Sequence, residues 1–228
     1  MSACVYGICD GDGFVYDEAT NTAFNCRCRR QIIAQRKARS LSAVIPRRYY
    51  DVAFERYPVT DIDRNVVAAT RRFADTIDEQ LDAGRGLWFM GDVGTGKTTL
   101  AMLVSKAALK AGRSVAIYSL PRLLNEIRDT HRAERSHVDL LDRLTAVDLL
   151  HIDDVGAERT TDWVLEELYS IVNARYEDER SMVITTNLDY DDLCTQITAR
   201  TASRLAEMCD QLPLDGADRR VELVHAEA

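Results

Sequence analysis

Apolar residues repeat at two different spacings along this chain. Beyond Asp61 they recur every three or four residues, which predicts an amphipathic helix ending at Gly84 and Gly86. Continuous apolar runs then alternate with segments of helical spacing. The predicted strands are 87–90, 114–119, 147–152 and 181–186, and the predicted helices are 98–111, 121–131, 138–144 and 163–176. Repeated strand-then-helix units with continuous apolar strands predict an α/β domain, with a parallel sheet covered by helices on both faces.

The first 45 residues follow a different pattern. Residues 1–30 are rich in Cys, Gly, Asp and Asn, and the alternating run at 13–16 between turn-forming residues predicts a small hairpin. Residues 29–41 are basic and favour a helix, which Pro46 terminates by disfavouring helical geometry at Ile45. We therefore place a domain boundary near residue 45, with a small module at 1–45 and the main domain at 46–228.

Length and composition agree with this division. The chain of 228 residues has room for one α/β domain and a small appendage, and 46% hydrophobic with 29% charged residues is ordinary for a globular protein. Its longest apolar runs are far shorter than the roughly 20 residues that a membrane-spanning helix requires. The N-terminus lacks the features of a secretory signal. We expect a cytoplasmic protein with no membrane partner.

The charge distribution limits how the chain would contact nucleic acid. A net charge of −8 argues against a protein that coats nucleic acid with its whole surface. Basic side chains nevertheless gather where the module meets the main domain. They are Arg27, Arg29, Arg30, Arg36, Lys37, Arg39, Arg47 and Arg48. This stretch is either a solvated linker or a contact for DNA or a protein partner, and the sequence leaves both open.

Residues 91–98 read GDVGTGKT, which satisfies the phosphate-loop pattern G-x-x-x-x-G-K-[ST] between a predicted strand and a predicted helix. Glycines let the loop wrap tightly around phosphates with its N–H groups inward, and the helix N-terminus adds a positive dipole end. We expect Lys97 to reach the β- and γ-phosphates of ATP and the Thr98 hydroxyl to ligate Mg²⁺. The predicted nucleotide-binding residues are Gly91, Asp92, Val93, Gly94, Thr95, Gly96, Lys97, Thr98 and Thr99.

Acidic side chains follow the predicted strand at 147–152. Ligands bind at the carboxyl ends of strands in open α/β sheets, so Asp153 is predicted to hold Mg²⁺, directly or through water. Asp154 would orient or deprotonate the attacking water. Asn187 ends the last predicted strand at the same edge and would hydrogen-bond the γ-phosphate or that water. His151, within the apolar run, is assigned to packing. An acidic pair alone is more often a turn or helix cap, and the phosphate loop favours the catalytic interpretation.

The six cysteines are unevenly distributed. Four lie within the first 28 residues, and in a reducing cytosol such clustering favours a metal site over disulfides. Two pairs of thiolates would hold one tetrahedral Zn²⁺, the staple that a module without its own core needs; free thiols are the alternative. Cys194 and Cys209 lie apart in sequence of helical character and are predicted core residues. The predicted zinc ligands are Cys4, Cys9, Cys26 and Cys28.

Taken together, these motifs resemble the DnaC/DnaI-like helicase-loader branch of the AAA+ ATPases, which also includes the IstB-type transposition ATPases. The resemblance runs from about residue 45 to residue 220. Its specific stretches are 45–49, the phosphate loop, 152–158, 168–176, 185–187 and 203–209. This combination is far more selective than a phosphate loop by itself. The resemblance implies an AAA+ P-loop NTPase core, and ATP bound between neighbouring subunits.

The resemblance also implies roles for individual residues. Arg204, in the S-R-L motif, would reach the next subunit's site as an arginine finger and neutralise charge on the transferred phosphoryl group. A surface salt bridge is the alternative role. Arg200 is the alternative finger, because residues 198–200 read TAR where the family usually has Gly-x-Arg. Residues 45–49 would flank the adenine, and Arg219 or Arg220 resembles a basic residue that senses nucleotide.

The function implied by the resemblance is ATP-dependent loading of a hexameric DnaB-type replicative helicase onto single-stranded DNA. The cysteine module would grip the helicase, and the AAA+ domain would self-associate. An IstB-like ATPase that regulates transposition on duplex DNA is the alternative; the cysteine module fits the first better. A third possibility is an adaptor that binds ATP but hardly hydrolyses it, since Asp154 stands where many such ATPases carry Glu.

Overall fold

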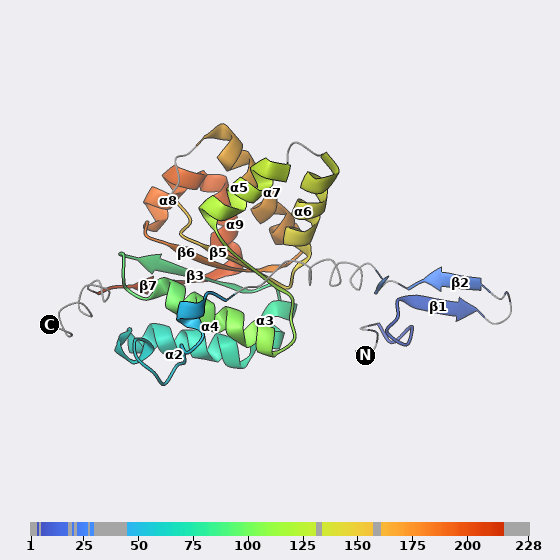
Figure 1. Cartoon of the computed structure of the whole chain (residues 1–228), viewed down its shortest axis with the longest axis horizontal. Helices are drawn as coiled ribbons and strands as arrows, with labels where there is room; N and C mark the ends of the chain where they lie inside the picture. Colours follow the sequence, from blue (N-terminus) through green and yellow to red (C-terminus); the bar gives the residue numbers. More distant parts are fainter. Residues whose placement is uncertain are drawn as a thin grey trace.

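A five-stranded parallel sheet organises the main domain (Figure 1). Its strands are β3 (Gly86–Gly91), β4 (Val115–Ser119), β5 (Leu149–Asp153), β6 (Ser181–Thr186) and β7 (Cys209–Leu214), in the spatial order β4-β5-β6-β3-β7. The computed structural model describes residues 4, 6–17, 20, 22–26, 28–29, 45–130, 134–156 and 161–216. Because the strands are parallel, the carboxyl ends of β3, β5 and β6 lie at one edge of the sheet, where ligands bind in such folds.

Helices cover both faces of this sheet (Figure 1). On one face lie α2 (Arg64–Asp75), α3 (Ile77–Asp82) and α4 (Lys97–Lys110). On the other face lie α5 (Leu120–Thr130), α6 (Glu134–Ala146), α7 (Asp162–Glu177), α8 (Tyr190–Ile197) and α9 (Ala199–Met208). Two short 3₁₀ helices, η1 (Arg47–Tyr49) and η2 (Val59–Asp61), precede α2. Within the described part of the chain, no helix is both long and apolar enough to span a bilayer.

The two layers enclose two apolar cores, because alternate side chains of each strand point to opposite faces. On β3, Trp88 packs into the core under α5–α9, whereas Leu87 and Phe89 pack into the core under α2–α4. All three side chains are almost completely buried. This arrangement explains why the strands read as continuous apolar runs, and the predicted α/β fold is confirmed.

Three regions differ from the sequence-based expectation. The single helix expected up to residue 84 is two helices, because at Thr76 the backbone leaves helical geometry and the Thr76 hydroxyl donates to the Arg72 carbonyl oxygen (2.9 Å). Helices α8 and α9 were not assigned from the pattern. Cys209 is a core residue as predicted, but it begins β7 and is not helical. Among the strands in the described residues, β7 pairs with β3 alone, and Pro213 is tolerated on such an edge strand.

A buried arginine joins the amino-terminal side of the sheet to α6. The Arg175 guanidinium is completely buried and donates to the carbonyl oxygens of Leu144 (2.7 Å), Val147 (3.0 Å) and Ser181 (2.6 Å). Burial lowers its pKa to about 9, so it still carries its charge near neutral pH. A single side chain therefore satisfies carbonyl groups at the end of α6 and at the entry to β5 and β6.

The N-terminal module contains the predicted hairpin. Strands β1 (Phe14–Asp17) and β2 (Thr22–Asn25) pair antiparallel, with Phe14 opposite Asn25. Residues 30–41 of the predicted basic helix lie outside the described residues, as do Arg219 and Arg220. The domain boundary near residue 45 stays a prediction.

Candidate nucleotide-binding site

The phosphate loop connects β3 to α4. Gly91 ends the strand with φ of +137°, and a Cβ atom there would lie 2.0 Å from the carbonyl oxygen of Leu214 on β7. Gly96, which precedes the first residue of α4, has φ of +102°. Both positions require glycine, one because of its neighbour and the other because of its left-handed backbone. The turn thus presents the N-terminus of α4 to the edge of the sheet, as an anion site requires.

Lys97 lies inside this loop. Its side chain is buried, and Nζ donates to the carbonyl oxygens of Gly91 and Asp92, each at 2.6 Å. The Thr95 hydroxyl also donates to the Asp92 carbonyl oxygen, at 2.9 Å. These contacts hold the ammonium group within the curve of the loop, where it can pair with phosphate oxygens.

The predicted magnesium ligands meet beside the loop. Thr98 Oγ1 donates to Asp153 Oδ1 at 2.9 Å, linking the first turn of α4 to the end of β5. Thr185 Oγ1, on β6, donates to the same carboxylate oxygen at 2.6 Å. A hydroxyl and a carboxylate are hard oxygen donors of the kind that Mg²⁺ takes, so this donor set fits the ion. Sequence reasoning missed Thr185; its signal was a threonine at the end of an otherwise apolar strand.

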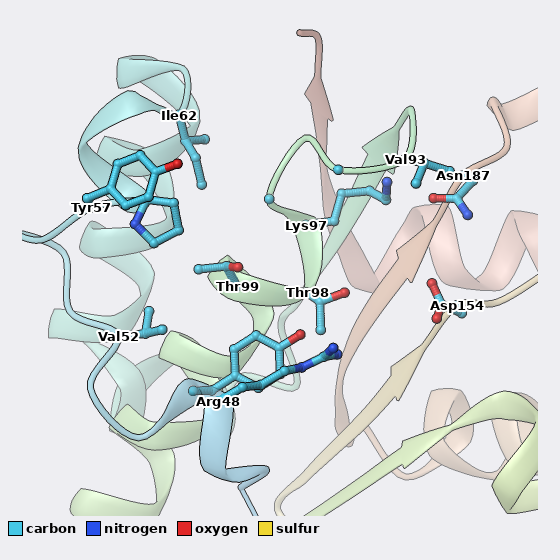
Figure 2. Close-up of a pocket in the computed structure, with 14 residues that line it drawn as sticks. Arg48, Val52, Tyr57, Ile62, Val93, Lys97, Thr98, Thr99, Asp154 and Asn187 are labelled. Atoms are coloured by element: carbon cyan, nitrogen blue, oxygen red, sulfur yellow. The ribbon is translucent and has the colours of Figure 1, made fainter. Parts of the chain in front are cut away.

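Asp154 adopts a backbone conformation that few side chains tolerate. Its φ is +59°, in the left-handed region where Asp and Asn are enriched over other non-glycine residues. Its backbone N–H donates to Thr185 Oγ1 at 2.9 Å. Together with Asn187, at the end of β6, it lines one side of the site (Figure 2). Aspartate is therefore one of the residue types that adopt this backbone conformation most readily.

His151 lies behind this edge, within β5. It is completely buried, its Nδ1 lies 3.0 Å from Ser105 Oγ, and burial lowers its pKa to about 3. The ring is therefore neutral near neutral pH and joins β5 to α4, which agrees with the packing role assigned from the sequence.

A cavity of about 510 Å³ extends from the phosphate loop to the segment that precedes α2 (Figure 2). It is lined by Arg48, Tyr49, Val52, Tyr57, Pro58, Ile62, Val93, Gly94, Gly96, Lys97, Thr98, Thr99, Asp154 and Asn187. Predicted residues Gly91, Asp92, Thr95 and Asp153 do not line it; they lie around or beneath the loop. The cavity is polar at the loop and largely aromatic and aliphatic at the other end, as an adenine nucleotide requires.

The end of this cavity away from the loop is aromatic and aliphatic apart from one arginine. We call it the base wall, after the adenine-flanking role expected of residues 45–49, and define it as Arg48, Tyr49, Val52, Tyr57, Pro58 and Ile62. The structure places Arg48 and Tyr49 of the predicted adenine-flanking stretch in this wall. The other four residues were missed, because an irregular segment has no periodicity that marks its inward side chains. The available signal was a group of aromatic and aliphatic residues between Pro46 and the first long helix.

The two candidate arginine fingers lie away from this cavity, on α9. The Arg200 guanidinium carbon is 4.8 Å from the ring centre of Tyr169 on α7. The Arg204 carbon is 5.2 Å from the same ring and 5.5 Å from the ring of Tyr176. Neither arginine lines the site of its own chain. A role for either in phosphoryl transfer therefore requires a neighbouring subunit.

The four N-terminal cysteines converge, with their sulfur atoms all within 4.8 Å of one another. Cys4 and Cys26 are 3.7 Å apart and Cys9 and Cys28 are 3.4 Å apart, measured between sulfur atoms. Tetrahedral Zn²⁺ with sulfur ligands at about 2.3 Å would separate them by roughly 3.8 Å. A backbone hydrogen bond from Ile8, with others nearby, lowers the pKa of the Cys4 thiol to about 6. The donor set fits a structural zinc ion.

The sheet order, the phosphate loop and the acidic pair beside it define the larger domain as a P-loop nucleotide-binding domain of the AAA+ class. The family model for IstB-like ATP binding proteins matches residues 28–221, so the chain belongs to that family.

Named relatives agree with this assignment. The replicative helicase loader DnaC of Buchnera aphidicola subsp. Schizaphis graminum is 27% identical over 182 residues, covering 76% of this chain and 73% of the relative. The replicative helicase loader DnaI of Bacillus subtilis is 25% identical over 215 residues, 86% of this chain and 68% of the relative. A crystal structure of the DnaC helicase loader has a TM-score of 0.65 at 26% identity, covering 75% of this chain and 100% of the other. These matches confirm the resemblance found in the motifs.

Proposed function

We propose that this chain is an ATP-dependent loader that places a hexameric replicative helicase onto single-stranded DNA. The observation that carries the proposal is the match to replicative helicase loaders along 76% of the chain, over a domain that contains the nucleotide site described above. A shared fold alone would not identify this function, because AAA+ domains serve many different functions. The named relatives, together with the extra cysteine module, favour it.

ATP would bind with its base against Tyr49, Val52 and Tyr57 and its phosphates in the loop. Lys97 would pair with the β- and γ-phosphates, and backbone N–H groups at the start of α4 would donate to them. Thr98 and Asp153 would hold Mg²⁺, which neutralises charge on the phosphate oxygens when it is bound. The cavity's polar and apolar ends thus match the two ends of the nucleotide.

Hydrolysis would use the residues at the other side of the loop. Asp154 orients the attacking water and takes its proton, while Asn187 hydrogen-bonds the γ-phosphate or that water. The bond between the γ-phosphorus and the bridging oxygen breaks, giving ADP and phosphate. Arg204, or alternatively Arg200, would stabilise the transferred phosphoryl group from the neighbouring subunit. Loss of the γ-phosphate then removes the contacts that hold subunits together and releases the helicase.

The cysteine module would supply the helicase contact. Five large hydrophobic side chains on it are 41–59% exposed, namely Tyr6, Ile8, Phe14, Tyr16 and Phe24. Exposed apolar groups gathered in so short a segment are typical of an interaction surface. Zinc held by the four cysteines would fix the hairpin, which carries Phe14, Tyr16 and Phe24, beside the preceding segment, which carries Tyr6 and Ile8. Binding would then bury aromatic surface that solvent now contacts.

The test is size-exclusion chromatography with light scattering of this protein mixed with the candidate helicase, with and without ATP. We expect a complex with the wild-type chain, weakened by Cys26→Ser and altered in its ATP dependence by Lys97→Ala. Cys194→Ser, which changes a half-buried cysteine on α8 outside the cluster, is the matched control. Failure of the wild-type chain to associate with any replicative helicase from its host would refute the proposal.

A second candidate function is regulation of transposition on duplex DNA. The name of the family, IstB-like ATP binding protein, is the observation that favours it. Electron microscopy separates the two candidates, because such a regulator would form ATP-dependent filaments on duplex DNA without any helicase. Filaments together with absent helicase binding would select this second function.

A further inference from the structure

The base wall lies in a segment with little regular structure. Between Ile45 and Asp63 the backbone contains only the 3₁₀ helices η1 and η2, three residues each. Short 3₁₀ helices have few internal hydrogen bonds of their own. Contacts from elsewhere in the fold therefore help to fix the positions of Tyr49 and Val52 relative to the phosphate loop.

Lys106, on α4, makes that contact. Its Nζ donates to the carbonyl oxygens of Tyr49 (3.3 Å), Tyr50 (2.9 Å) and Val52 (2.7 Å). An ammonium group has three N–H donors, so three acceptors use its full capacity. Tyr49 and Tyr50 lie at the end of η1, and Val52 follows two residues after Tyr50, so these acceptors fall where the helix no longer supplies backbone donors. One half-buried lysine thus fastens the backbone behind the wall to α4.

The same helix begins at the phosphate loop. Lys97 is the first residue of α4, and Lys106 lies nine positions later on the same rigid element. Tyr49 also packs in the apolar core beneath α2–α4, which includes Leu103 of α4. Helix α4 therefore holds the loop at its first turn and the backbone of the base wall at its third turn.

We propose that Lys106 is a positioning residue for the base: it holds the wall at a fixed place relative to the phosphate loop, and so lets the site prefer a nucleotide over its bare polyphosphate. This inference rests on the proposed binding of ATP. If Lys106 only stabilised the fold, its loss would weaken the binding of every ligand alike. If it positions the wall, its loss weakens the binding only of ligands that carry a base.

The experiment measures binding of ATP, ADP and inorganic tripolyphosphate to the full chain by calorimetry. Lys106→Met keeps the stem of the side chain but removes all three donors. We expect it to weaken ATP and ADP binding roughly tenfold or more, because a displaced wall loses contacts with the base, with tripolyphosphate changed less than about twofold. Lys110→Met, at the exposed end of the same helix, is the matched control and should match wild type.

The outcomes separate the two proposals. Wild-type protein that fails to bind ATP would contradict the proposed function. Wild-type protein that binds ATP, with Lys106→Met binding it equally well, would overturn only the role of Lys106; so would equal weakening of ATP and tripolyphosphate. Lys106→Gln retains a shorter donor and should show a smaller loss selective for the base-containing ligands. It serves as the test if Lys106→Met does not fold.

Discussion

Thr185 Oγ1 on β6 donates a 2.6 Å hydrogen bond to Asp153 Oδ1 on β5. Thr185 Oγ1 also accepts a hydrogen bond from the backbone N–H of Asp154 at 2.9 Å, so one completely buried hydroxyl orients both acidic residues at the end of β5. Outer partners of this kind fix the orientation of a carboxylate that binds metal.

Replacing this hydroxyl should impair hydrolysis more than binding. Thr185→Val preserves shape but leaves the Asp153 carboxylate without its donor and the Asp154 N–H without its acceptor. We expect ATP turnover to fall roughly 10- to 100-fold, measured by phosphate release. Thr145→Val, on α6 and away from the site, should leave turnover unchanged. Equal turnover in the Thr185→Val and wild-type proteins would show that the hydroxyl does not orient the acids.

Asp154→Asn should separate binding from hydrolysis. Asparagine tolerates the left-handed backbone at this position, so the loop keeps its shape while the carboxylate is lost. We expect ATP affinity within about twofold of wild type and turnover at least roughly 100-fold lower. Fluorescent-nucleotide binding and phosphate release measure the two quantities. If the wild-type chain, supplied with DNA, already turns over ATP no faster than Lys97→Ala, the protein is an ATP-binding adaptor instead.

An arginine finger acts between subunits, so two inactive variants should complement each other. Arg204→Ala alone should lower turnover by roughly 10³-fold, and so should Lys97→Ala. Mixing them creates interfaces with an intact phosphate loop and an intact finger, and part of the activity should return. The same mixture with Arg200→Ala identifies the finger, because only the variant that lacks it needs complementation. Activity of Arg204→Ala at the wild-type level would leave Arg204 with its stacking contacts alone.

Arg175 should be the most sensitive arginine for stability. Arg175→Leu leaves the buried carbonyl groups of Leu144, Val147 and Ser181 without their donor. We expect the free energy of unfolding to fall by roughly 3–5 kcal/mol, measured by urea denaturation. Arg71→Leu, which removes an exposed ion pair with Glu55, should cost less than about 1 kcal/mol. Similar losses for the two variants would contradict the role given to the buried guanidinium.

Metal analysis tests the cysteine cluster directly. We expect one zinc ion per chain by elemental analysis, reduced by Cys26→Ser and retained by Cys194→Ser. Removing the ion with a chelator should abolish helicase association while ATP affinity stays the same, because the nucleotide site uses none of these residues. A chain purified without metal would show that the thiols are free. Helicase binding by that chain would contradict the role of zinc in holding the module.

The central strands could be predicted from the sequence because burial on both faces leaves continuous apolar runs. The phosphate loop could be predicted because phosphate binding restricts residues 91–98 to a narrow pattern. The break at Thr76 was not readable, since the apolar spacing continues through it. β7 was not predicted, because its polar residues and Pro213 interrupt the apolar pattern of a strand. The base wall depends on a backbone held by Lys106, a contact across more than 50 positions that no local pattern encodes.

Nine residues along α4 correspond to about 14 Å of helix, and Lys97 and Lys106 stand at the two ends of that interval. Helix α4 therefore sets the spacing between the phosphate loop and the base wall. A ligand that contacts both the phosphate loop and the base wall must carry a base and a polyphosphate at that spacing. In the proposed binding mode, AMP would contact the base wall without filling the loop, and pyrophosphate would fill the loop without touching the wall. In that mode, the length of α4 would determine which ligands contact both the phosphate loop and the base wall.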